Sequence, residues 1–333
     1  MRLIRRKYQS EDDYWTIRAF LREVFLLNDR REVGWPAYRW DYWRWHGNEN
    51  ISRFDLSAAV FLWETAEGRL AAVLHPEGVG EAFLQAHPAF RSAELEVAMM
   101  SAAETQYAVT QADGRQRLTL WAHASDLVRR DLLQRRGYTR GNFPEYQRRR
   151  RMDAPIPDFG PPAGYVLRAL GDEGELPARS WISWRAFHPD EPDDKYEGWA
   201  WYRSVQAAPL YRRDLDLVAV APGGELAAFC TLWFDDVTRT AAFEPVGTHP
   251  DHQRRGLGRA LMAEGLRRVR HMGATLCTVS SCSEAAGALY TSLGFTEYEL
   301  NEPWVCGERM WSPDDADTPG NPLSLSEASL PGA

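Results

Sequence analysis

Short runs in which hydrophobic and polar residues alternate occur in pairs at corresponding places in the two halves of the chain. In the first half Ala58–Glu64 and Arg69–His75 flank a Glu-Gly turn, and in the second half Asp216–Ala221 and Leu226–Trp233 flank a Gly-Gly turn. Alternation over such lengths, with glycine in the turn, is typical of a β-hairpin. We therefore predict one hairpin in each half.

The order of elements after each hairpin is also repeated. A strand ending in His-Pro comes first, over Phe83–His87 and Phe243–His249, and a helix follows, over Ala93–Gln106 and Gly258–His271. A buried strand and a second helix come next, and that helix ends at a glycine followed by an aromatic residue. Glycine is a frequent stop signal for a helix. The repeated order indicates two copies of one domain.

A segment rich in proline and glycine lies between the two copies, and such a composition continues neither a helix nor a central strand. The run Arg148–Arg151 before it is interpreted as solvated side chains on a terminal strand. The C-terminal residues are mainly Ser, Pro, Gly, Asp and Ala, which is typical of disorder. The predicted organisation is a first domain over 1–152, a linker over 153–162, a second domain over 163–311 and a disordered tail over 312–333.

The composition argues against several kinds of function. The chain has 333 residues, with 39 Lys and Arg against 47 Asp and Glu, and its net charge of −8 argues against a nucleic-acid surface. It contains no apolar run of the roughly 18 residues that a membrane span needs. The cysteines form neither C-x-x-C pairs nor zinc spacings with histidine, so we expect no metal site and a reducing cytoplasm. They are Cys230, Cys277, Cys282 and Cys306.

Aromatic residues are concentrated in one stretch of the first half. Trp40 and Trp43, with Tyr42 between them, have near-helical spacing, which favours a helix that anchors bulky side chains in the core. The alternative is that these rings form the wall of a ligand pocket. The stretch contains Trp35, Tyr38, Trp40, Tyr42, Trp43 and Trp45.

The segment Gln253–Leu261 follows a strand, opens an amphipathic helix and contains Gly256 and Gly258. The first backbone N–H groups of a helix have no partner within the helix, and a glycine-containing loop lets them turn toward an anion. The helix dipole favours a phosphate at the same place. Positive charge is added by three arginines, Arg254, Arg255 and Arg259.

With this loop inside this order of elements, the second half resembles the GNAT acyltransferase superfamily. The family signature Q/R-x-x-G-x-G/A is met at Gln253, Gly256 and Gly258. The later element N-x-x-A-x-x-L-Y-x-x-x-G-F is met at Ala286, Leu289, Tyr290, Gly294 and Phe295, with Ser283 where asparagine is usual. The resemblance covers 164–311 closely and 1–151 by topology only. It implies an α/β (α+β) fold of two tandem GNAT-like domains, each a mixed, mostly antiparallel sheet with flanking helices.

The resemblance implies acetyl-CoA as co-substrate and no metal. In this superfamily the fourth and fifth strands splay apart and expose backbone groups to the pantetheine arm. Pro245 lacks a backbone donor and marks a bulge that opens the strands. The residues expected to contact acetyl-CoA are Val246, Gly247, Thr248, Gln253, Arg254, Arg255, Gly256, Leu257, Gly258, Arg259 and Ser283.

Two residues are candidates for proton transfer. Glu244 is the candidate base, acting through water, and Tyr290 is the candidate acid for the leaving thiolate. The alternatives are a partly exposed strand carboxylate and a structural aromatic residue at a helix end. The expected reaction of the catalytic domain over 163–311 is direct acetyl transfer to the primary amine of a small molecule. A CoA-binding regulator without turnover, or an acyltransferase acting on a peptide or protein amine, remains an alternative.

The first half lacks the glycine loop. Glu94 and Glu96 stand where Gly256 and Gly258 stand in the second half, and carboxylates repel a phosphate. We therefore expect that the first half does not bind CoA. It is expected to support the catalytic domain and to form a wall of the acceptor pocket.

Overall fold

The repeated order of strands and helices is present in the computed structural model, which describes residues 2–307. The described residues form two compact units. The first unit comprises 2–40, 52–145 and 299–307, and the second comprises 41–51 and 146–298. The tail predicted over 312–333 lies outside the described residues.

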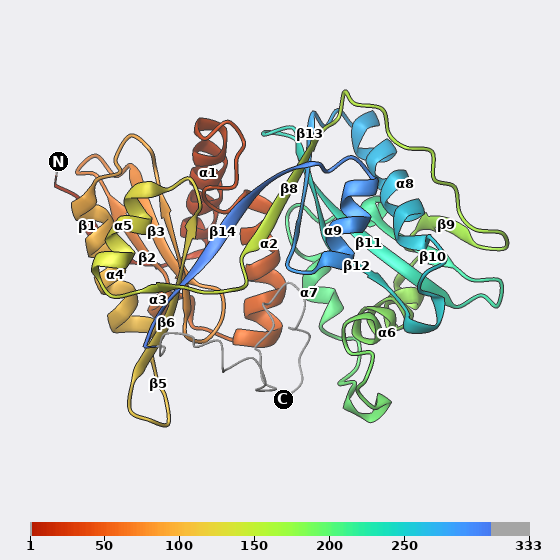
Figure 1. The fold of residues 1–333 in the computed structure, drawn as a ribbon, viewed down its shortest axis with the longest axis horizontal. Coiled ribbons are helices and arrows are strands. Elements are labelled where there is room, and N and C mark those ends of the chain that lie inside the picture. The colour runs from red at the N-terminus through yellow and green to blue at the C-terminus, as the bar shows by residue number, and fades with distance from the viewer. Residues whose placement is uncertain (1, 308–333) are drawn as a thin grey trace. The chain divides into compact units, whose positions relative to one another are not determined.

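The first unit contains a mixed sheet in the order β1-β2-β3-β4-β6-β14, with β5 beside β6 and β7 beside β14. The β4–β6 pair is parallel, and the other pairs are antiparallel. The strands are β1 (Ile4–Lys7), β2 (Phe61–Glu64), β3 (Leu70–Pro76), β4 (Glu81–Ala86), β5 (Val109–Thr110), β6 (Gln116–His123), β7 (Thr139–Arg140) and β14 (Glu297–Cys306). The helices are α1 (Glu11–Leu27), α3 (Leu56–Ala59), α4 (Ala93–Tyr107) and α5 (Leu127–Arg135) (Figure 1).

The second unit contains the order β8-β13-β12-β11-β10-β9, in which only β12–β13 is parallel among the described pairs. Its strands are β8 (Glu145–Arg151), β9 (Val166–Ala169), β10 (Asp216–Val220), β11 (Leu226–Asp235), β12 (Thr240–Thr248) and β13 (Leu276–Ser281). Its helices are α6 (Leu176–Phe187), α7 (Tyr202–Gln206), α8 (Leu257–His271) and α9 (Glu284–Ser292). The inserted residues 41–51 comprise the last two residues of helix α2 (Ala37–Tyr42) and nearly all of the π-helical segment Trp43–Ser52.

The two copies predicted from the sequence are confirmed. A hairpin, a strand, a helix and a parallel strand follow one another as β2–β3, β4, α4 and β6 in one unit and as β10–β11, β12, α8 and β13 in the other. The helix-stop glycines also match, because Gly137 and Gly294 have φ of 83° and 87°. Some boundaries differ. The first-half strand predicted from Ala58 begins at Phe61, because Leu56–Ala59 forms a helix capped by Asp55, and the second-half strand predicted from Phe243 begins at Thr240.

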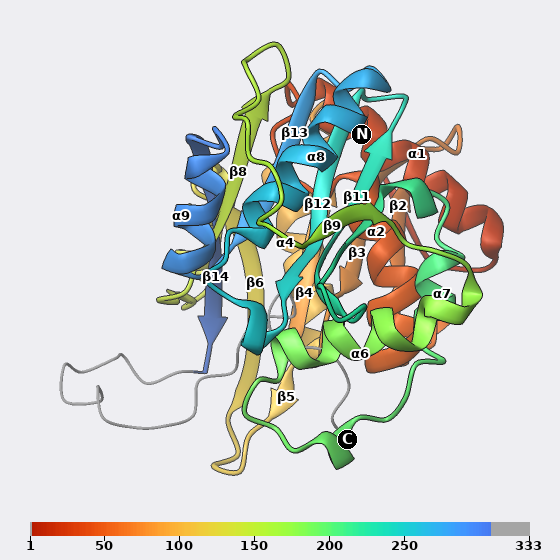
Figure 2. The ribbon, with the colours of Figure 1, turned by 90° about the vertical axis from the view of Figure 1, so that its right-hand side faces the viewer.

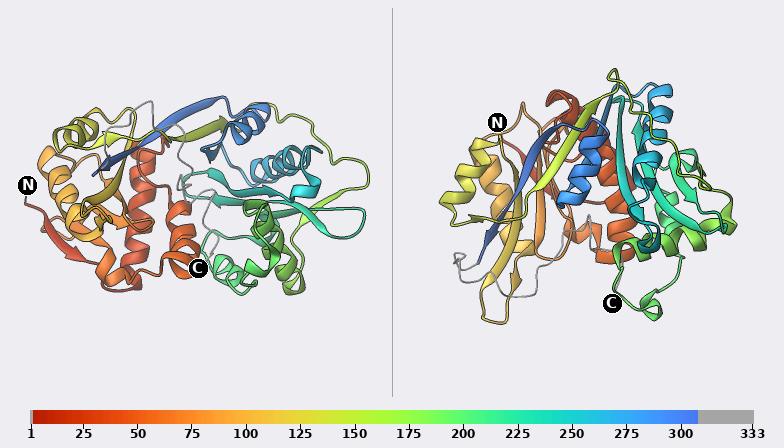
Figure 3. Two further views of the ribbon diagram at one scale, coloured as in Figure 1. Left: turned by 60° about the horizontal axis from the view of Figure 1, so that its bottom comes forward. Right: turned by 45° about the vertical axis from the view of Figure 1, so that its right-hand side comes forward.

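The last strand of each half belongs to the other unit. Strand β8, from the first half, pairs antiparallel with β13, while β14, from the second half, pairs antiparallel with β6. In Figure 3 the yellow-green strand is β8 and the long blue strand is β14. The predicted division into 1–152 and 163–311 therefore differs from the compact units in these strands and in residues 41–51.

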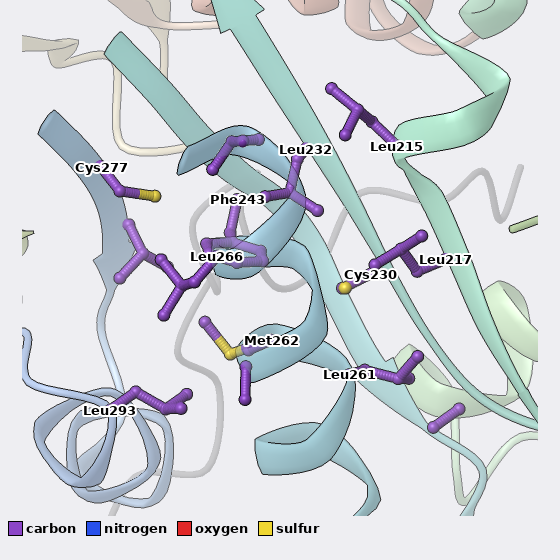
Figure 4. Packing of buried hydrophobic residues seen from close by; sticks show 14 of the residues in the cluster. Leu215, Leu217, Cys230, Leu232, Phe243, Leu261, Met262, Leu266, Cys277 and Leu293 are labelled. Carbon is purple, nitrogen blue, oxygen red and sulfur yellow. The ribbon is translucent and has the colours of Figure 1, made fainter. Parts of the chain in front are cut away.

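Helices α6 and α8 cover opposite faces of the second sheet (Figure 2). Along β11 successive side chains point to opposite faces. Leu261 and Leu266 of α8 share a buried cluster with Cys230 and Phe243, as Figure 4 shows. A Cβ at Gly265 would lie 2.7 Å from Leu232 Cδ1, so glycine lets α8 approach the sheet closely. This packing fixes the start of α8 against the end of β12. No helix within residues 2–307 is long and apolar enough to cross a membrane.

Candidate active site

Strand β12 contains a bulge at its centre. Glu244 and Pro245 on β12 lie opposite the single residue Thr231 on β11, where the register shifts by one. Proline has no backbone N–H to give to a ladder, so a bulge is one of the few places in a sheet where it fits. The bulge predicted at Pro245 is confirmed, and it turns the backbone that follows.

Beyond the bulge, β12 separates from its parallel neighbour β13. The pairs between these strands end at Phe243 and Val279. Strand β12 then continues to Thr248 against β11, while β13 continues to Ser281 against β8. The strands therefore splay apart, as expected, and the β13-facing backbone edge of Val246–Thr248 borders the opening.

The opposite side of this stretch is closely packed. A Cβ at Gly247 would lie 2.4 Å from Phe229 Cζ and 3.0 Å from Ala186 Cβ on α6. Such distances are far inside van der Waals contact, so a larger residue would force β12 and α6 apart. Gly247 thereby keeps the strand pressed against α6 and leaves its other edge to the opening.

The loop after β12 is held by its own side chains. His249 Nδ1 accepts from the Asp251 N–H at 3.3 Å, and Gln253 Nε2 donates to the Thr248 carbonyl at 3.4 Å. Arg255 Nη2 donates to the Asp251 carbonyl at 3.1 Å. Burial lowers the pKa of His249, which suits its role as acceptor. These bonds hold the loop in one shape before helix α8 begins.

Two residues of the loop have left-handed backbone, Arg254 with φ of 62° and Gly256 with φ of 83°. Gly256 precedes α8, whose first backbone bond runs from the Ala260 N–H to the Gly256 carbonyl at 3.1 Å. The N–H groups of residues 257–259 therefore precede the hydrogen-bond ladder of the helix. Only glycine adopts this φ without cost, so Gly256 sets the direction in which these donors point.

Three elements meet at the first turn of α8. A Cβ at Gly258 would lie 3.5 Å from Leu289 Cδ2 on α9 and 3.9 Å from Thr248 Oγ1 on β12. The guanidinium of Arg259 lies over the Phe159 ring at 4.8 Å. The loop arginines are exposed, whereas Leu257 is buried. The helix start therefore lies next to the end of the splayed strand, and exposed arginines place positive charge beside it.

Helix α9 brings Tyr290 toward the bulge. Ser283 caps the helix, because its hydroxyl accepts from the Ala286 N–H at 3.3 Å. Tyr290 is buried, and its ring meets Phe295 edge-on at 6.4 Å. Phe295 in turn lies 6.3 Å from Phe243, the residue before Glu244. These ring contacts connect Tyr290 with Phe243, the sequence neighbour of Glu244.

The arginine run on β8 is not the solvated patch expected from the sequence. Arg150 is 4% exposed, and its Nη1 donates to the Leu293 carbonyl at 2.6 Å. Arg148 Nη1 lies 3.5 Å from the Phe295 carbonyl. Carbonyl groups at the end of a helix attract positive charge, so these arginines fasten the end of α9 that carries Tyr290. The burial of these arginines could not be predicted from the run itself, because it depends on the pairing of β8 with β13 of the other half.

A buried ion pair supports the face of the bulge that α6 covers. Arg179 Nε donates to Asp216 Oδ1 at 2.9 Å, and neither side chain is exposed. Asp216 Oδ2 also accepts from the Tyr202 hydroxyl at 2.5 Å and the Tyr211 hydroxyl at 2.9 Å. Burial and the Asp216 charge raise the pKa of Tyr211, so its hydroxyl stays a donor. Sequence reasoning missed this network, because its members are scattered along the chain.

The corresponding place in the first unit is occupied by the protein itself. His87 Nδ1 accepts from the Ala89 N–H at 3.1 Å, which repeats the bond of His249. Glu96, which stands where Gly258 does, is fully buried between Arg91 Nε at 2.6 Å and Arg129 Nε at 2.9 Å. Burial opposes its ionisation, but Arg129 and Arg91 keep the pKa of Glu96 low. Glu94 is exposed. Within the described residues no group of three His, Cys, Asp or Glu is arranged to hold a metal ion.

Comparison with known proteins places this arrangement in a family. The Acetyltransferase (GNAT) family model matches residues 176–295. The mycothiol acetyltransferase of Kineococcus radiotolerans is 28% identical over 242 residues, which is 70% of this chain and 75% of that protein. The mycothiol acetyltransferase of Salinispora tropica is 29% identical over 254 residues, 73% of this chain and 80% of that protein.

Solved structures show the same fold at lower identity. A tandem GNAT protein from the clavulanic acid biosynthesis pathway has a TM-score of 0.64 at 18% identity, covering 92% of this chain and 98% of that one. A GCN5-related N-acetyltransferase from Sphaerobacter thermophilus has a TM-score of 0.63 at 18% identity, covering 91% and 95%. The family model covers most of the second unit, which is therefore a GNAT acetyltransferase domain, and the chain as a whole has the fold of a tandem GNAT protein.

Proposed function

We propose that the second unit transfers an acetyl group from acetyl-CoA to the primary amine of a small molecule by direct attack. The observation that carries this proposal is the divergence of β12 from β13 next to the first turn of α8. The divergence exposes a backbone edge of β12 to which an extended chain with amide groups can bind. The first N–H groups of α8 can donate hydrogen bonds to a phosphate. Proteins of this family use acetyl-CoA.

The residues present fit such a donor molecule. The edge of Val246, Gly247 and Thr248 would bind the pantetheine amides, while Gln253 holds the Thr248 carbonyl in place. The left-handed Gly256 would turn the first N–H groups of α8 toward the pyrophosphate, and Gly258 places no side chain in its way. Ser283 caps α9 where the family has asparagine. The remaining contacts are assigned to Leu257 through its N–H and to Arg254, Arg255 and Arg259 through their charge.

The transfer needs three things from the chain. Glu244, at the bulge, takes the proton from the attacking amine through water. Backbone N–H groups after the bulge polarise the thioester carbonyl as the nitrogen–carbon bond forms. Tyr290 gives a proton to the sulfur as the carbon–sulfur bond breaks. The proton taken up by Glu244 then passes through solvent to the Tyr290 phenolate. A neutral amine and acetyl-CoA thus give the acetylated amine and free CoA thiol, with protons and charge balanced.

A small-molecule acceptor is supported by the relatives, whose names assign them to mycothiol. The buried Glu96 with its two arginines supports the assignment of a single CoA site to the second unit. We infer that the first unit supports the fold and does not bind the donor.

A thiol-release assay tests the proposal. Purified protein and acetyl-CoA are mixed with a panel of small primary amines, amino acids and peptides, and CoA binding is measured separately by calorimetry. Release with small amines is the expected result. Binding without release by any acceptor would indicate a CoA-binding regulator, and release with peptides alone would indicate a peptide acyltransferase.

A further inference from the structure

Residues 41–51 belong to the second unit although they come from the first half of the chain. We propose that this inserted segment completes the acceptor side of the transferase site, and that Tyr42, packed against the buried ring of His46, selects a primary amine attached to an uncharged ring. The inference rests on the proposed function and adds the class of acceptor and the residues that choose it.

The segment is fastened to α7 at its far end. Asn50 Nδ2 donates to Ser204 Oγ at 2.8 Å, and the His46 ring lies 4.9 Å from the ring of Trp201. Helix α7 also carries Tyr202, whose hydroxyl binds the buried Asp216 beneath the bulge. The segment is thus tied to the same framework that supports Glu244.

At its N-terminal end the segment is connected to the bulge by the indole of Trp233. The Tyr42 ring meets Trp233 edge-on at 5.6 Å, and Trp233 Nε1 donates to the Glu244 carbonyl at 2.6 Å. Tyr42 also lies 5.0 Å from the His46 ring. Tyr42, His46 and Trp201 therefore form a continuous row of rings, which we call the aromatic row, beginning beside the candidate base. Unlike Trp40 and Trp43, which are 0% and 2% exposed, Tyr42 is only partly buried.

The aromatic row is uncharged. Burial and the charge of Glu244 raise the pKa of Tyr42, so its hydroxyl keeps its proton. Burial lowers the pKa of His46 to about 4, and Asn50 Nδ2 lies 3.3 Å from His46 Nδ1, where a neutral imidazole accepts. Arg44 and Glu49 of the segment pair with each other at 3.1 Å, and its third charged residue, Asp41, is fully buried.

This chemistry defines the acceptor. Glu244 takes the proton of the reacting amine, and the partly exposed Tyr42 ring beside it offers apolar area and dispersion contacts to whatever carries that amine. A flat or cyclic skeleton covers such a row better than a flexible chain, because it loses less conformational freedom on binding. A second ammonium next to the row would lose part of its hydration to uncharged rings. An amine on an uncharged ring fits both conditions.

The test compares cyclohexylmethylamine with hexamethylenediamine as acceptors for the full chain. We expect the ring amine to have the higher kcat/KM, and Tyr42→Ala to lower this preference roughly five- to tenfold, the value of one aromatic contact. Tyr42→Phe keeps the ring and should keep the preference. Tyr298→Ala, at a residue that is 51% exposed, is the matched control. Acetyl-CoA affinity should not change in any of these variants.

Each outcome separates the inference from the proposed function. If the wild type prefers the diamine, or if Tyr42→Ala keeps the preference while turnover persists, the aromatic row does not select the acceptor, although the transferase function stands. If no amine of any class releases thiol, both fail. Should Tyr42→Ala not fold, Tyr42→Leu fills the space without a ring and is measured in its place.

Discussion

The indole Nε1 of Trp233 donates a hydrogen bond of 2.6 Å to the main-chain carbonyl of Glu244. Trp233 lies on β11 and is 1% exposed, so the bond is shielded from water. The carbonyl belongs to the bulge, where the regular ladder between β11 and β12 is interrupted. The Trp233 side chain on β11 thus supplies the hydrogen-bond donor that the backbone of β11 does not give to the Glu244 carbonyl on β12. The orientation of Glu244, and with it the proposed base, depends on this bond.

Trp233→Phe should therefore reduce catalysis more than donor binding. Removing the indole N–H leaves the Glu244 carbonyl without this partner, which costs about 1–3 kcal/mol at a buried position. We expect kcat to fall roughly tenfold, with acetyl-CoA affinity unchanged within about twofold. Steady-state kinetics and calorimetry measure the two quantities.

Trp304→Phe is the control for loss of ring volume alone. Trp304 is buried in the first unit, and its Nε1 has no hydrogen-bond partner within the described residues. This variant should keep full activity. Equal losses of kcat in the two variants would mean that the Trp233 bond does not position the base.

Gly256→Glu should abolish acetyl-CoA binding. Gly256 has φ of 83° at the start of α8, so any side chain is strained there, and a carboxylate repels the pyrophosphate. We expect affinity to fall roughly a hundredfold or more. Calorimetry on the wild type should give one CoA per chain.

The matched control is Gly224→Glu, which places the same charge on another left-handed glycine, with φ of 94°, in the turn between β10 and β11. Its binding should equal that of the wild type. Tight binding by Gly256→Glu, or a second CoA per chain, would contradict the assignment of the single phosphate site to this loop.

The position of Gly256 could be predicted because its information is local. A strand, a glycine loop and a helix start are contiguous in the chain, and the bulge at Pro245 likewise depends on one residue and its neighbours. Such features depend on backbone preferences of a few neighbouring residues.

The partners across the chain could not be predicted in this way. Strands β8 and β14 each come at the end of a half, but the residues of a strand do not say which sheet it joins. The burial of Arg150 against Leu293, and the place of Tyr42 beside Trp233, follow from that exchange of segments. The residues that support the candidate site therefore could not be predicted from the sequence, whereas its glycine loop could.

Tyr290→Phe should lower turnover much more than donor affinity. The ring packs edge-on against Phe295, and this contact survives in phenylalanine, so the variant should fold normally. If Tyr290 protonates the leaving sulfur, kcat should fall by roughly two orders of magnitude. Tyr298→Phe, at an exposed position, should leave kcat unchanged. A Tyr290→Phe variant with full turnover would make Tyr290 a structural residue.

The stability of the second unit should fall in mild acid because of His46. Burial lowers its folded-state pKa from 6.5 to about 4, so the folded protein resists a proton that the unfolded chain accepts. The stability due to neutral His46 is therefore fully present above pH 6.5 and is lost as the pH falls through about 4. The shift corresponds to at most about 3 kcal/mol.

The difference in unfolding free energy between the wild type and His46→Asn isolates this contribution, because the other titrating groups are common to both. We expect the difference to shrink as the pH is lowered from 6.5 to about 4 in urea titrations. Asn cannot take up the proton, but it can still face Asn50, which lies 3.3 Å from His46 Nδ1. A difference that stays constant across this range would show that His46 is hydrated in solution, and the uncharged aromatic row beside Tyr42 would then lose one of its members.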